Sequence, residues 1–446
     1  MLRRTFATLS KPANIAKRDW SVLCPYLSPP GRLSSEQVMK MESTYSAKNY
    51  SPMQVVFSSA KGCVITDPEG KEYFDFLAAY SAVNQGHCHP RLLKAMASQM
   101  EYCTLSSRAF YNNRFGQYAH FITRFFGYDR MLPMNTGAEA CETALKMARR
   151  WGYEVKKIPA DKAIIVTAAE NFHGRTLACI SMSTDPESYG NYGPKLPGLM
   201  SIPYDDVPAL EKVLQENGDR IAAYIMEPIQ GEAGVFVPRP GYYTAVRELC
   251  TKYNVLWIAD EVQSGIGRAG KLLAVDYEEA RPDVVTLGKA LSGGLYPVSA
   301  VLADADVMGV FTPGTHGSTF GGNPLASVLG IESLKVLVEE RMIENSFAMG
   351  EKFRGMLKEI QSRHPAILTA YRGRGLMNAI DLDESKDDHC AYLLCKTMLK
   401  NGLLAKPTHG KTVRLTPPLT INAEQIAKAA DIIEKSIVEV ETKLKY

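Results

Sequence analysis

Five short apolar runs, separated by segments of helical periodicity, occupy the middle of this 446-residue chain. Continuous apolar runs of this length are typical of strands that are covered on both faces, and strands that alternate with helices form a mostly parallel sheet. The chain is therefore predicted to be an α/β protein built on such a sheet. The predicted strands are 163–167, 221–226, 255–259, 284–287 and 298–302, and the helical segments include 207–216 and 242–253.

Two of these runs lead into a charged residue, Asp260 after 255–259 and Lys289 after 284–287. Ligands of parallel α/β sheets bind at the carboxyl ends of the strands, so the two side chains are expected to share one crevice. An amine in an apolar pocket can attack a carbonyl, and a carboxylate can keep a heteroaromatic nitrogen protonated. Pyridoxal phosphate requires this pair. Considered alone, such a lysine is more often solvated, and such an aspartate more often caps a helix.

Polar and aromatic residues also follow two further strands, at 171–175 and 227–232. Functional groups at several successive strand ends suggest one shared site. Apolar residues at helical spacing begin near Gly137, in the motif NTGAEA. The backbone amides of Gly137 and Ala138 would be bare at this helix N-terminus, and such amides form a seat for a phosphate. As a single motif this is a weak signal, because many helices start with threonine and glycine.

Changes in composition divide the chain into four predicted segments. Residues 1–33 are basic and poor in acids, which is typical of an organelle transit peptide but also of a basic tail in a cytosolic protein. The mitochondrial matrix and the cytoplasm therefore both remain open. Residues 34–85 contain a hairpin that is expected to pack on the small domain. Residues 86–324 are predicted to form the large cofactor-binding domain, and residues 325–446 a smaller α/β domain with long amphipathic helices.

Composition also argues against several classes of partner. A net charge of +3 without long basic clusters gives no indication of nucleic-acid binding. No apolar run approaches the roughly 18 residues that a membrane helix needs. The nine cysteines include no CxxC pair, which favours free thiols over a disulfide framework. Cys88 lies between His87 and His89, but adjacent ligands without a distant second pair are a weak zinc signal, so no metal site is predicted.

The motifs around these residues resemble those of a known enzyme family. LWIADEVQSGIGRAGK, TLGKALSGG, NTGAEA and STFGGNP are similar to the class III pyridoxal-phosphate aminotransferases of fold type I, from about Tyr50 to the C-terminus. Within that class, SAVNQGHCHP, NFHGRT, EPIQGEAGV and VRLTPPL most resemble the ornithine δ-aminotransferases. The resemblance implies a large domain with a mostly parallel sheet and a smaller α/β C-terminal domain.

The activity implied by this resemblance is an amino transfer between two small molecules. The δ-amino group of L-ornithine would pass to 2-oxoglutarate through pyridoxal 5'-phosphate. The products would be glutamate and glutamate 5-semialdehyde, which cyclises to pyrroline-5-carboxylate.

The resemblance assigns contacts with the cofactor ring to four positions. Lys289 would hold the cofactor aldehyde as a Schiff base, and Asp260 would bind the pyridine nitrogen. Phe172 would lie against the ring. Gln263 would bind the phenolic oxygen.

The phosphate contacts follow from the same resemblance. The amides of Gly137 and Ala138 would bind the cofactor phosphate. Thr319 of the neighbouring subunit would complete this phosphate site. The resemblance therefore implies a homodimer.

Substrate contacts are implied in the same way. Tyr50 and Arg175 would hold the α-carboxylate of ornithine, so that the δ-amine reaches the cofactor, and Tyr80 would help to select ornithine over shorter ω-amino acids. Glu232 would pair with Arg414 while ornithine is bound. Glu232 would then swing away, so that Arg414 can bind the α-carboxylate of 2-oxoglutarate.

Two kinds of alternative remain open. A neighbouring aminotransferase could use N-acetylornithine or 4-aminobutyrate, although Tyr50 together with Tyr80 suits a free α-amino acid headgroup. A cofactor-free binding or scaffold protein could retain the fold, although Lys289 and Asp260 are both present. One position departs from the family pattern: His173 stands where relatives carry an indole side chain, and this change is expected to alter local packing but to touch none of the roles named above.

Overall fold

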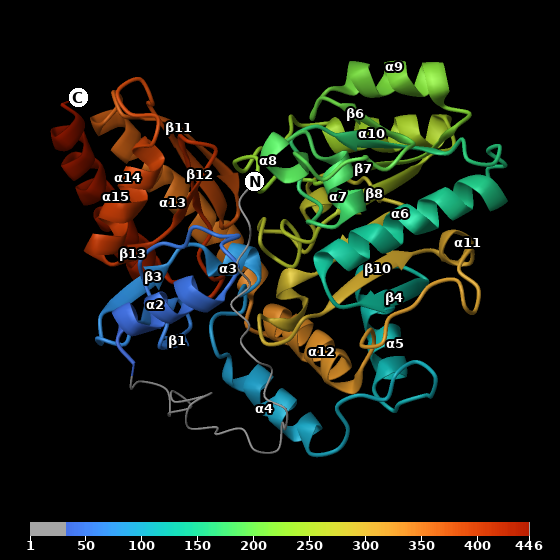
Figure 1. Cartoon of the computed structure of the whole chain (residues 1–446), viewed down its shortest axis with the longest axis horizontal. Coiled ribbons are helices and arrows are strands. Elements are labelled where there is room, and N and C mark those ends of the chain that lie inside the picture. Colours follow the sequence, from blue (N-terminus) through green and yellow to red (C-terminus); the bar gives the residue numbers. More distant parts are fainter. Residues whose placement is uncertain (1–32, 446) are drawn as a thin grey trace, which may run out of the picture. The chain divides into compact units, whose positions relative to one another are not determined.

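The structure, a computed structural model, describes residues 33–445 (Figure 1). The predicted N-terminal extension lies outside these residues apart from its last position. The chain divides into two compact units, which are described separately. The first unit comprises the chain up to Ser59 and Thr66–Glu72, and the second comprises Ala60–Ile65 and the chain from Tyr73 onward.

Within its described residues, the first unit contains helix α2 (Ser35–Tyr45). The Ser34 hydroxyl accepts a hydrogen bond from the Gln37 amide at 3.3 Å, and the Gln37 side chain accepts one from the Ser34 amide at 2.9 Å. These reciprocal bonds form a capping box, which explains where the helix begins. The predicted hairpin turn is also present, because the Gly70 amide donates to the Asp67 carbonyl at 3.1 Å.

The second unit contains a seven-stranded sheet of order β4-β10-β9-β8-β7-β5-β6. Strands β5 to β9 run parallel, and β10 runs antiparallel to β9 and β4, so the prediction of a mostly parallel sheet is confirmed. The strands are β4 (Arg130–Met134), β5 (Ile164–Ala168), β6 (Leu199–Ile202), β7 (Ile221–Met226), β8 (Leu256–Asp260), β9 (Val284–Leu287) and β10 (Ser299–Ala303).

All five predicted strands belong to this sheet, and the two edge strands were not predicted. Strand β4 contains Pro133, a residue that cannot donate to a ladder and is confined to edges. Strand β6 is short and only its last residue, Ile202, is buried. Neither edge strand therefore shows the continuous apolar pattern of the central strands.

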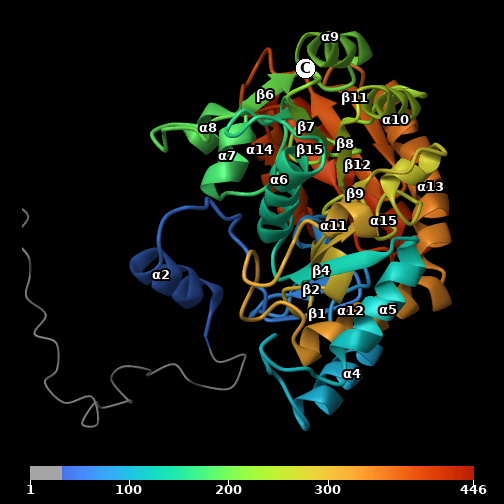
Figure 2. The same ribbon diagram turned by 90° about the vertical axis from the view of Figure 1, so that its right-hand side faces the viewer.

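Helices α6 (Gly137–Glu154) and α10 (Tyr242–Lys252) cover opposite faces of the sheet (Figure 2). Side chains alternate across a strand, and neighbours in β7 show this directly. Ala223 packs in the core that includes α6, whereas the Tyr224 hydroxyl lies 2.7 Å from the Tyr242 hydroxyl of α10. Because both faces are covered, the ends of the strands are the places that remain accessible to a ligand.

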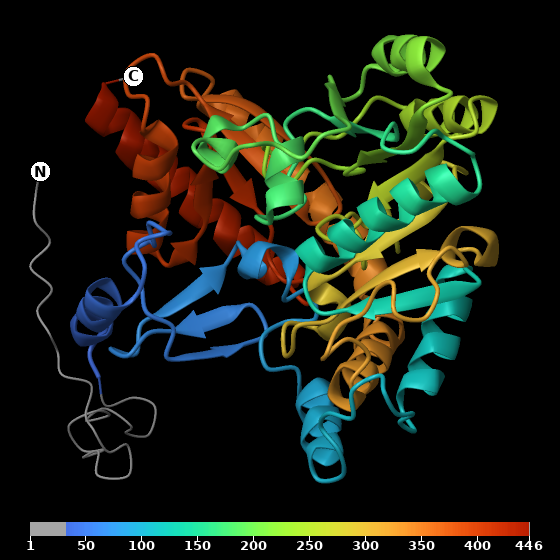
Figure 3. The same ribbon diagram turned by 45° about the vertical axis from the view of Figure 1, so that its right-hand side comes forward.

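A second sheet is formed by the C-terminal part of the chain, drawn in orange and red in Figure 3. Its order is β11-β12-β15-β14, and all pairs are antiparallel. The strands are β11 (Leu368–Arg374), β12 (Met377–Leu382), β14 (Lys406–Thr408) and β15 (Thr412–Leu415), and the helices are α12 (Pro324–Glu339), α13 (Met342–Arg363), α14 (Cys390–Asn401) and α15 (Ala423–Leu444). The long amphipathic helices that the sequence predicts, at 326–340, 343–364 and 422–444, correspond to α12, α13 and α15, and α14 is not predicted.

A third, small sheet has the order β1-β2-β3-β13. Its strands are β1 (Ser59–Lys61), β2 (Val64–Thr66), β3 (Glu72–Asp75) and β13 (Leu403–Leu404). Strand β13 pairs in parallel with β3, with Leu403 opposite Phe74 and Leu404 opposite Asp75. This pairing joins the strand after the N-terminal hairpin turn to the C-terminal part of the chain.

Shorter helices complete the second unit. They are α3 (Ala78–Ser81), α4 (Pro90–Met100), α5 (Phe115–Phe126), α7 (Leu177–Met182), α8 (Pro186–Tyr189), α9 (Val207–Asn217) and α11 (Ala305–Met308), with the 3-10 helices η2 (Ala274–Tyr277) and η3 (Lys289–Ser292). Across residues 33–445, the structure contains no helix with the length and apolar character needed to span a bilayer.

Candidate active site

A pocket lies at the carboxyl ends of the central strands, where the sequence predicts it. Asp260 is the last residue of β8, and Lys289 follows the neighbouring parallel strand β9. Both side chains line this one pocket, as expected. The full lining is Gly137, Ala138, Cys141, Phe172, His173, Gly174, Glu227, Asp260, Val262, Gln263 and Lys289.

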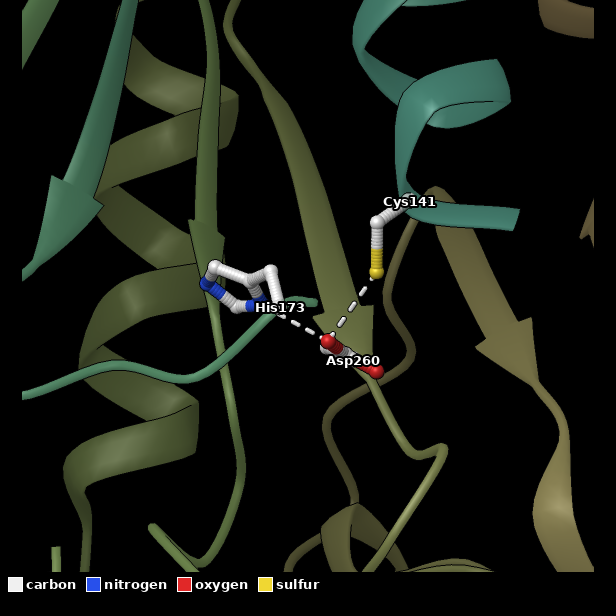
Figure 4. A group of neighbouring side chains, drawn as sticks. All are labelled: Cys141, His173 and Asp260. Atoms are coloured by element: carbon white, nitrogen blue, oxygen red, sulfur yellow. Dashed lines mark hydrogen bonds and ion pairs between the residues drawn. The ribbon is translucent and has the colours of Figure 1, made fainter. Parts of the chain in front are cut away.

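The Asp260 carboxylate is held by four hydrogen bonds. Its Oδ1 accepts from the Thr286 hydroxyl at 2.9 Å and from the Val262 amide at 3.1 Å. Its Oδ2 accepts from the Cys141 thiol at 3.1 Å and lies 2.6 Å from His173 Nδ1 (Figure 4). Burial alone raises the pKa of Asp260, but the hydrogen bond and charge of His173 outweigh burial and hold this pKa below its ordinary value. Asp260 is therefore an anion held in place in the pocket. The expectation that His173 touches none of the named roles is wrong, because its ring contacts the Asp260 carboxylate directly.

Cys141, His173 and Asp260 also offer ligand atoms within 4.8 Å of one another, a spacing that a metal ion could use. Metal binding through sulfur requires a thiolate. Burial, the largest cause, together with the charge of Asp260 raises the pKa of the Cys141 thiol well above its ordinary value. The thiol is therefore protonated and acts as a hydrogen-bond donor to Asp260, which disfavours a metal at this cluster.

Lys289 is placed at the start of η3 by a left-handed backbone conformation with φ of 44°. Burial lowers the pKa of Lys289 below its ordinary value, although the charges of Glu232 and Asp260 oppose this shift. A lowered pKa increases the fraction of neutral amine. Only a neutral amine can attack a carbonyl or accept a proton, so the environment suits both tasks.

The N-terminus of α6 forms one end of the pocket. Thr136 and Glu139 cap the helix reciprocally, with the Glu139 amide 3.2 Å from the Thr136 hydroxyl. A Cβ atom on Gly137 would approach Val262 to 2.7 Å, so only glycine fits against this loop. The first-turn amides of Gly137 and Ala138 border the pocket, and a helix N-terminus of this kind favours an anion such as phosphate.

Glu227 is a buried acid whose role the sequence does not assign. It follows the fully buried strand β7, and its carboxylate accepts from the Phe172 amide at 2.9 Å and from the Gly231 amide at 3.2 Å. Burial raises the pKa of Glu227 to about 7. Glu227 thus connects two loops beside the pocket by hydrogen bonds, the loop that carries Phe172 and the loop that carries Gly231. A charged residue directly after a completely apolar strand is the signal that could have identified it.

Glu232 and Arg414 form the predicted ion pair, with Oε1 2.6 Å from Nη1. The same Oε1 accepts from Gln263 Nε2 at 3.2 Å. Burial raises the pKa of Glu232, but the charge and hydrogen bond of Arg414 outweigh it and lower this pKa below its ordinary value. Among the described residues, Arg414 Nε has no hydrogen-bond partner although it is buried. Buried donors are almost always paired, so this guanidinium has capacity for a further acceptor.

Tyr80 lies beside this ion pair. The guanidinium carbon of Arg414 is 5.1 Å from the centre of the Tyr80 ring, within the range of a cation–π contact. Lys406 Nζ lies 6.0 Å from the same ring. The predicted substrate residues Tyr80, Glu232 and Arg414 are therefore adjacent.

Tyr80, Glu232 and Arg414 do not belong to the pocket lining itself, and three other predicted residues are also absent from it and are exposed. Arg175 is exposed, donates from Nη1 to the Ser188 hydroxyl at 2.8 Å and lies 5.4 Å from the Phe172 ring centre. Thr319 is exposed on the loop between α11 and α12, and it is not among the residues that line the pocket. Tyr50 is exposed and belongs to the first unit.

The residues of the pocket fit pyridoxal phosphate. Asp260 is anionic and can pair with a protonated pyridine nitrogen, Lys289 tends towards the neutral amine that an aldehyde requires, and the N-terminus of α6 suits a phosphate. Phe172 supplies an aromatic surface in the same pocket. Together with the mostly parallel sheet, these features define a pyridoxal-phosphate-dependent enzyme of fold type I.

Comparisons with known proteins agree with this definition. The model of the family "Aminotransferase class-III" matches residues 45–437, and the chain belongs to this family. It is similar to a mitochondrial ornithine aminotransferase of Arabidopsis thaliana, with 57% identity over 407 residues that cover 91% of this chain and 85% of the relative. Family membership, with Lys289 and Asp260 in place, favours an enzyme over a cofactor-free scaffold.

Two solved structures extend the comparison. An ornithine aminotransferase from Toxoplasma gondii, described with partial occupancy of pyridoxal phosphate at its active site, has a TM-score of 0.90 and 46% identity, covering 93% of this chain and 96% of that one. An acetylornithine aminotransferase from Elizabethkingia anophelis has a TM-score of 0.84 and 46% identity, covering 91% and 100%. The fold and class are thus established.

Proposed function

We propose that this protein transfers the δ-amino group of L-ornithine to 2-oxoglutarate, yielding glutamate and glutamate 5-semialdehyde, which cyclises to pyrroline-5-carboxylate. The observation that carries the proposal is the Glu232–Arg414 pair beside Tyr80, next to the pocket of Lys289 and Asp260. A site that must accept two carboxylate substrates of different shape in turn needs an arginine whose charge can be masked and released.

Different pocket residues are proposed to bind different groups of the cofactor. Pyridoxal phosphate supplies an aldehyde that condenses with amines and a pyridinium ring that withdraws electrons from the carbon bearing the amine. Asp260 would keep the ring nitrogen protonated, Gln263 would bind the phenolic oxygen and Phe172 would lie against the ring. The amides of Gly137 and Ala138 would hold the phosphate.

Lys289 has two tasks in this reaction. Its amine would hold the aldehyde of pyridoxal phosphate when no substrate is bound. When ornithine is bound, Nζ is free to take a proton from ornithine Cδ, the carbon that carries the reacting amine, as a general base. The lowered pKa of Lys289 favours the neutral form that this transfer requires.

Substrate orientation depends on a second set of residues. Tyr50 and Arg175 hold the α-carboxylate and so direct the δ-amine to the cofactor. Glu232 neutralises Arg414 in this half-reaction. In the other half-reaction Glu232 moves away, and Arg414 binds the α-carboxylate of 2-oxoglutarate through a bidentate contact.

The working enzyme is proposed to be a homodimer in which Thr319 completes the phosphate site of the neighbouring subunit. Thr319 is exposed on its own chain. The loop that carries it adjoins the loop between α4 and α5, since Asn112 Nδ2 donates to the Gly322 carbonyl at 3.4 Å. These two loops expose large apolar side chains, Tyr102, Phe110, Tyr111 and Phe320. Exposed apolar groups gathered in one region are typical of a protein interface.

The proposed location is the mitochondrial matrix. The name of the Arabidopsis relative places that protein in mitochondria, and the basic, acid-poor residues 1–33 suit a transit peptide. A fluorescent fusion of the full chain should enter mitochondria, and a fusion without residues 1–33 should remain outside them. Equal distributions of the two fusions would contradict the proposal.

A substrate panel tests the proposed function. Purified holoenzyme is assayed with ornithine, N-acetylornithine and 4-aminobutyrate as amine donors, each with 2-oxoglutarate as acceptor. The proposal predicts the highest kcat/KM for ornithine and formation of pyrroline-5-carboxylate. A higher kcat/KM for either competing donor would overturn it.

A further inference from the structure

The segment labelled α3, which carries Tyr80, is a left-handed turn and not a regular α-helix. Ala78, Ala79, Tyr80 and Ser81 have φ values of 48°, 48°, 59° and 71°, and none of them is glycine. Residues with a Cβ visit the left-handed region singly, because Cβ then lies too close to the following carbonyl oxygen. Four such residues in succession persist only when the surrounding structure imposes the conformation.

Asp75 holds the entrance of this left-handed turn. Its Oδ1 accepts from the Leu77 amide at 2.9 Å and from the Ala78 amide at 2.8 Å. Its Oδ2 lies 2.7 Å from His87 Nε2, and only 3% of the Asp75 side chain is exposed. The carboxylate is thus fixed from one side by His87 and orients two successive amides on the other.

A second anchor connects the turn to the strand of Arg414. The Thr416 amide donates to the Phe76 carbonyl at 2.8 Å, and the Thr416 hydroxyl donates to the Leu77 carbonyl at 3.1 Å. Thr416 directly follows β15, which contains Arg414. The position of Tyr80 is therefore fixed relative to Arg414 through backbone contacts at both elements.

Because the turn and β15 are connected in this way, the Tyr80 ring contacts the Arg414 guanidinium. A right-handed conformation at the same residues would send the Tyr80 side chain in a different direction and expose Arg414. An exposed arginine beside the pocket would attract the carboxylate of a shorter ω-amino acid, which then competes with ornithine.

We propose that the left-handed turn Ala78–Ser81 is a specificity device, and that Asp75 and His87 are positioning residues that keep Tyr80 against Arg414. This inference rests on the proposed function and extends it, because it assigns amine selection to the backbone of the turn and not only to the Tyr80 side chain. Neither Asp75 nor His87 needs to touch the substrate.

Ala79 offers a direct test, because its side chain is exposed and its φ is left-handed. Ala79→Val places a β-branched residue there, which strongly disfavours this region. The matched control is Asp161→Val, since Asp161 is also exposed with φ of 60° but precedes β5 at its amino end. Both variants should lower Tm. Only Ala79→Val should lower the ratio of kcat/KM for ornithine to kcat/KM for 4-aminobutyrate, by about tenfold or more.

Asp75→Asn provides a second variant that removes the charge facing His87 with little change in size. It should lower the same ratio and raise KM for ornithine, while kcat in the glutamate direction stays within about twofold of wild type. If Ala79→Val does not fold, Asp75→Asn carries the test alone. Wild-type ratios in the folded variants, despite a lower Tm, would overturn the inference and leave a purely structural turn.

Failure of the inference and failure of the proposed function are distinguishable. The wild-type substrate panel decides the function before any variant is made. If wild type prefers ornithine and the variants keep that preference, only the inference fails. If wild type prefers 4-aminobutyrate or N-acetylornithine, the proposed function fails whatever the variants do.

Discussion

Arg414 Nη1 lies 2.6 Å from Glu232 Oε1, and the two partners differ in exposure: 4% of the Arg414 side chain is exposed but 26% of that of Glu232. Charged groups that are buried cost free energy unless they are paired. The more exposed partner is therefore the one that can move, and a carboxylate of the incoming substrate can replace it at Arg414.

Replacement of Glu232 should separate the two half-reactions. Glu232→Ala leaves Arg414 unmasked, so the α-carboxylate of ornithine can bind at the wrong position. We expect the ornithine half-reaction to slow by at least about tenfold, equivalent to about 1.4 kcal/mol, with a smaller effect on the glutamate half-reaction. Single-turnover absorbance measurements of each half-reaction check this. Equal losses in both would contradict the masking role.

Asp260 should matter for the electronic work of the cofactor more than for folding. Asp260→Asn keeps the size and can still bond to Thr286, but it removes the negative charge that stabilises a protonated ring nitrogen. Activity should fall by roughly 10²- to 10³-fold, as for other preorganised charged partners. Tm of the holoenzyme should also fall, because the change removes the buried charge that faces His173. Activity within about threefold of wild type would contradict the assignment, since an electrostatic role of this size would then be absent.

The buried acid Glu227 predicts a particular dependence of stability on pH. Its pKa is raised from 4.5 to about 7 in the folded protein, so the folded state favours the protonated form. The stabilising contribution of this protonation is fully present below pH 4.5 and is lost as pH rises through about 7. Between these pH values, the contribution of Glu227 to the free energy of unfolding should decrease by about 3 kcal/mol, whereas a group that does not titrate would contribute equally throughout.

Glu227→Gln supplies that reference, because glutamine has nearly the same shape and no charge. The free energy of unfolding of wild type minus that of Glu227→Gln should decrease as pH rises from 4.5 to above 7. Denaturant titrations of both proteins at several pH values measure this difference. A difference that is constant with pH, or that increases, would show that Glu227 is not buried as described.

Substitution of Thr319 tests the proposed homodimer. If Thr319 reaches the phosphate of the neighbouring subunit, Thr319→Ala should weaken cofactor binding by about tenfold, equivalent to one hydrogen bond to a charged group. Thr251→Ala, an exposed threonine on α10, is the control and should bind the cofactor like wild type. Cofactor titration gives the affinities, and sedimentation should show a dimer for all three proteins. A wild-type monomer with full activity would contradict the dimer.

The sequence predicts those elements of the fold that depend on the local pattern of apolar and polar residues. The five central strands are continuous apolar runs, and the adjacent placement of Asp260 and Lys289 follows from parallel pairing of β8 and β9. Helix α14 was missed although Cys390, Leu394, Cys395 and Met398 are buried at helical spacing, because its exposed face carries no clear cap or charge pattern.

Other features of the site depend on contacts that are distant in sequence. Cys141 has the spacing of an ordinary helix core residue, and its bond to Asp260 appears only when α6 packs on the sheet. The left-handed turn could not be predicted, since alanine, tyrosine and serine each lose about 1–2 kcal/mol in that region. The turn is held in this conformation by contacts of Asp75, His87 and Thr416, which the fold brings together.

Lys289 is proposed to anchor pyridoxal phosphate in an enzyme that acts on ornithine. Borohydride reduction of purified holoenzyme, followed by peptide mass spectrometry, tests both parts of this proposal. We expect one cofactor-modified peptide carrying Lys289, loss of that modification when ornithine is added before reduction, and no such peptide in Lys289→Ala. Modification at another lysine, or the same labelling with and without ornithine, would contradict this role of Lys289.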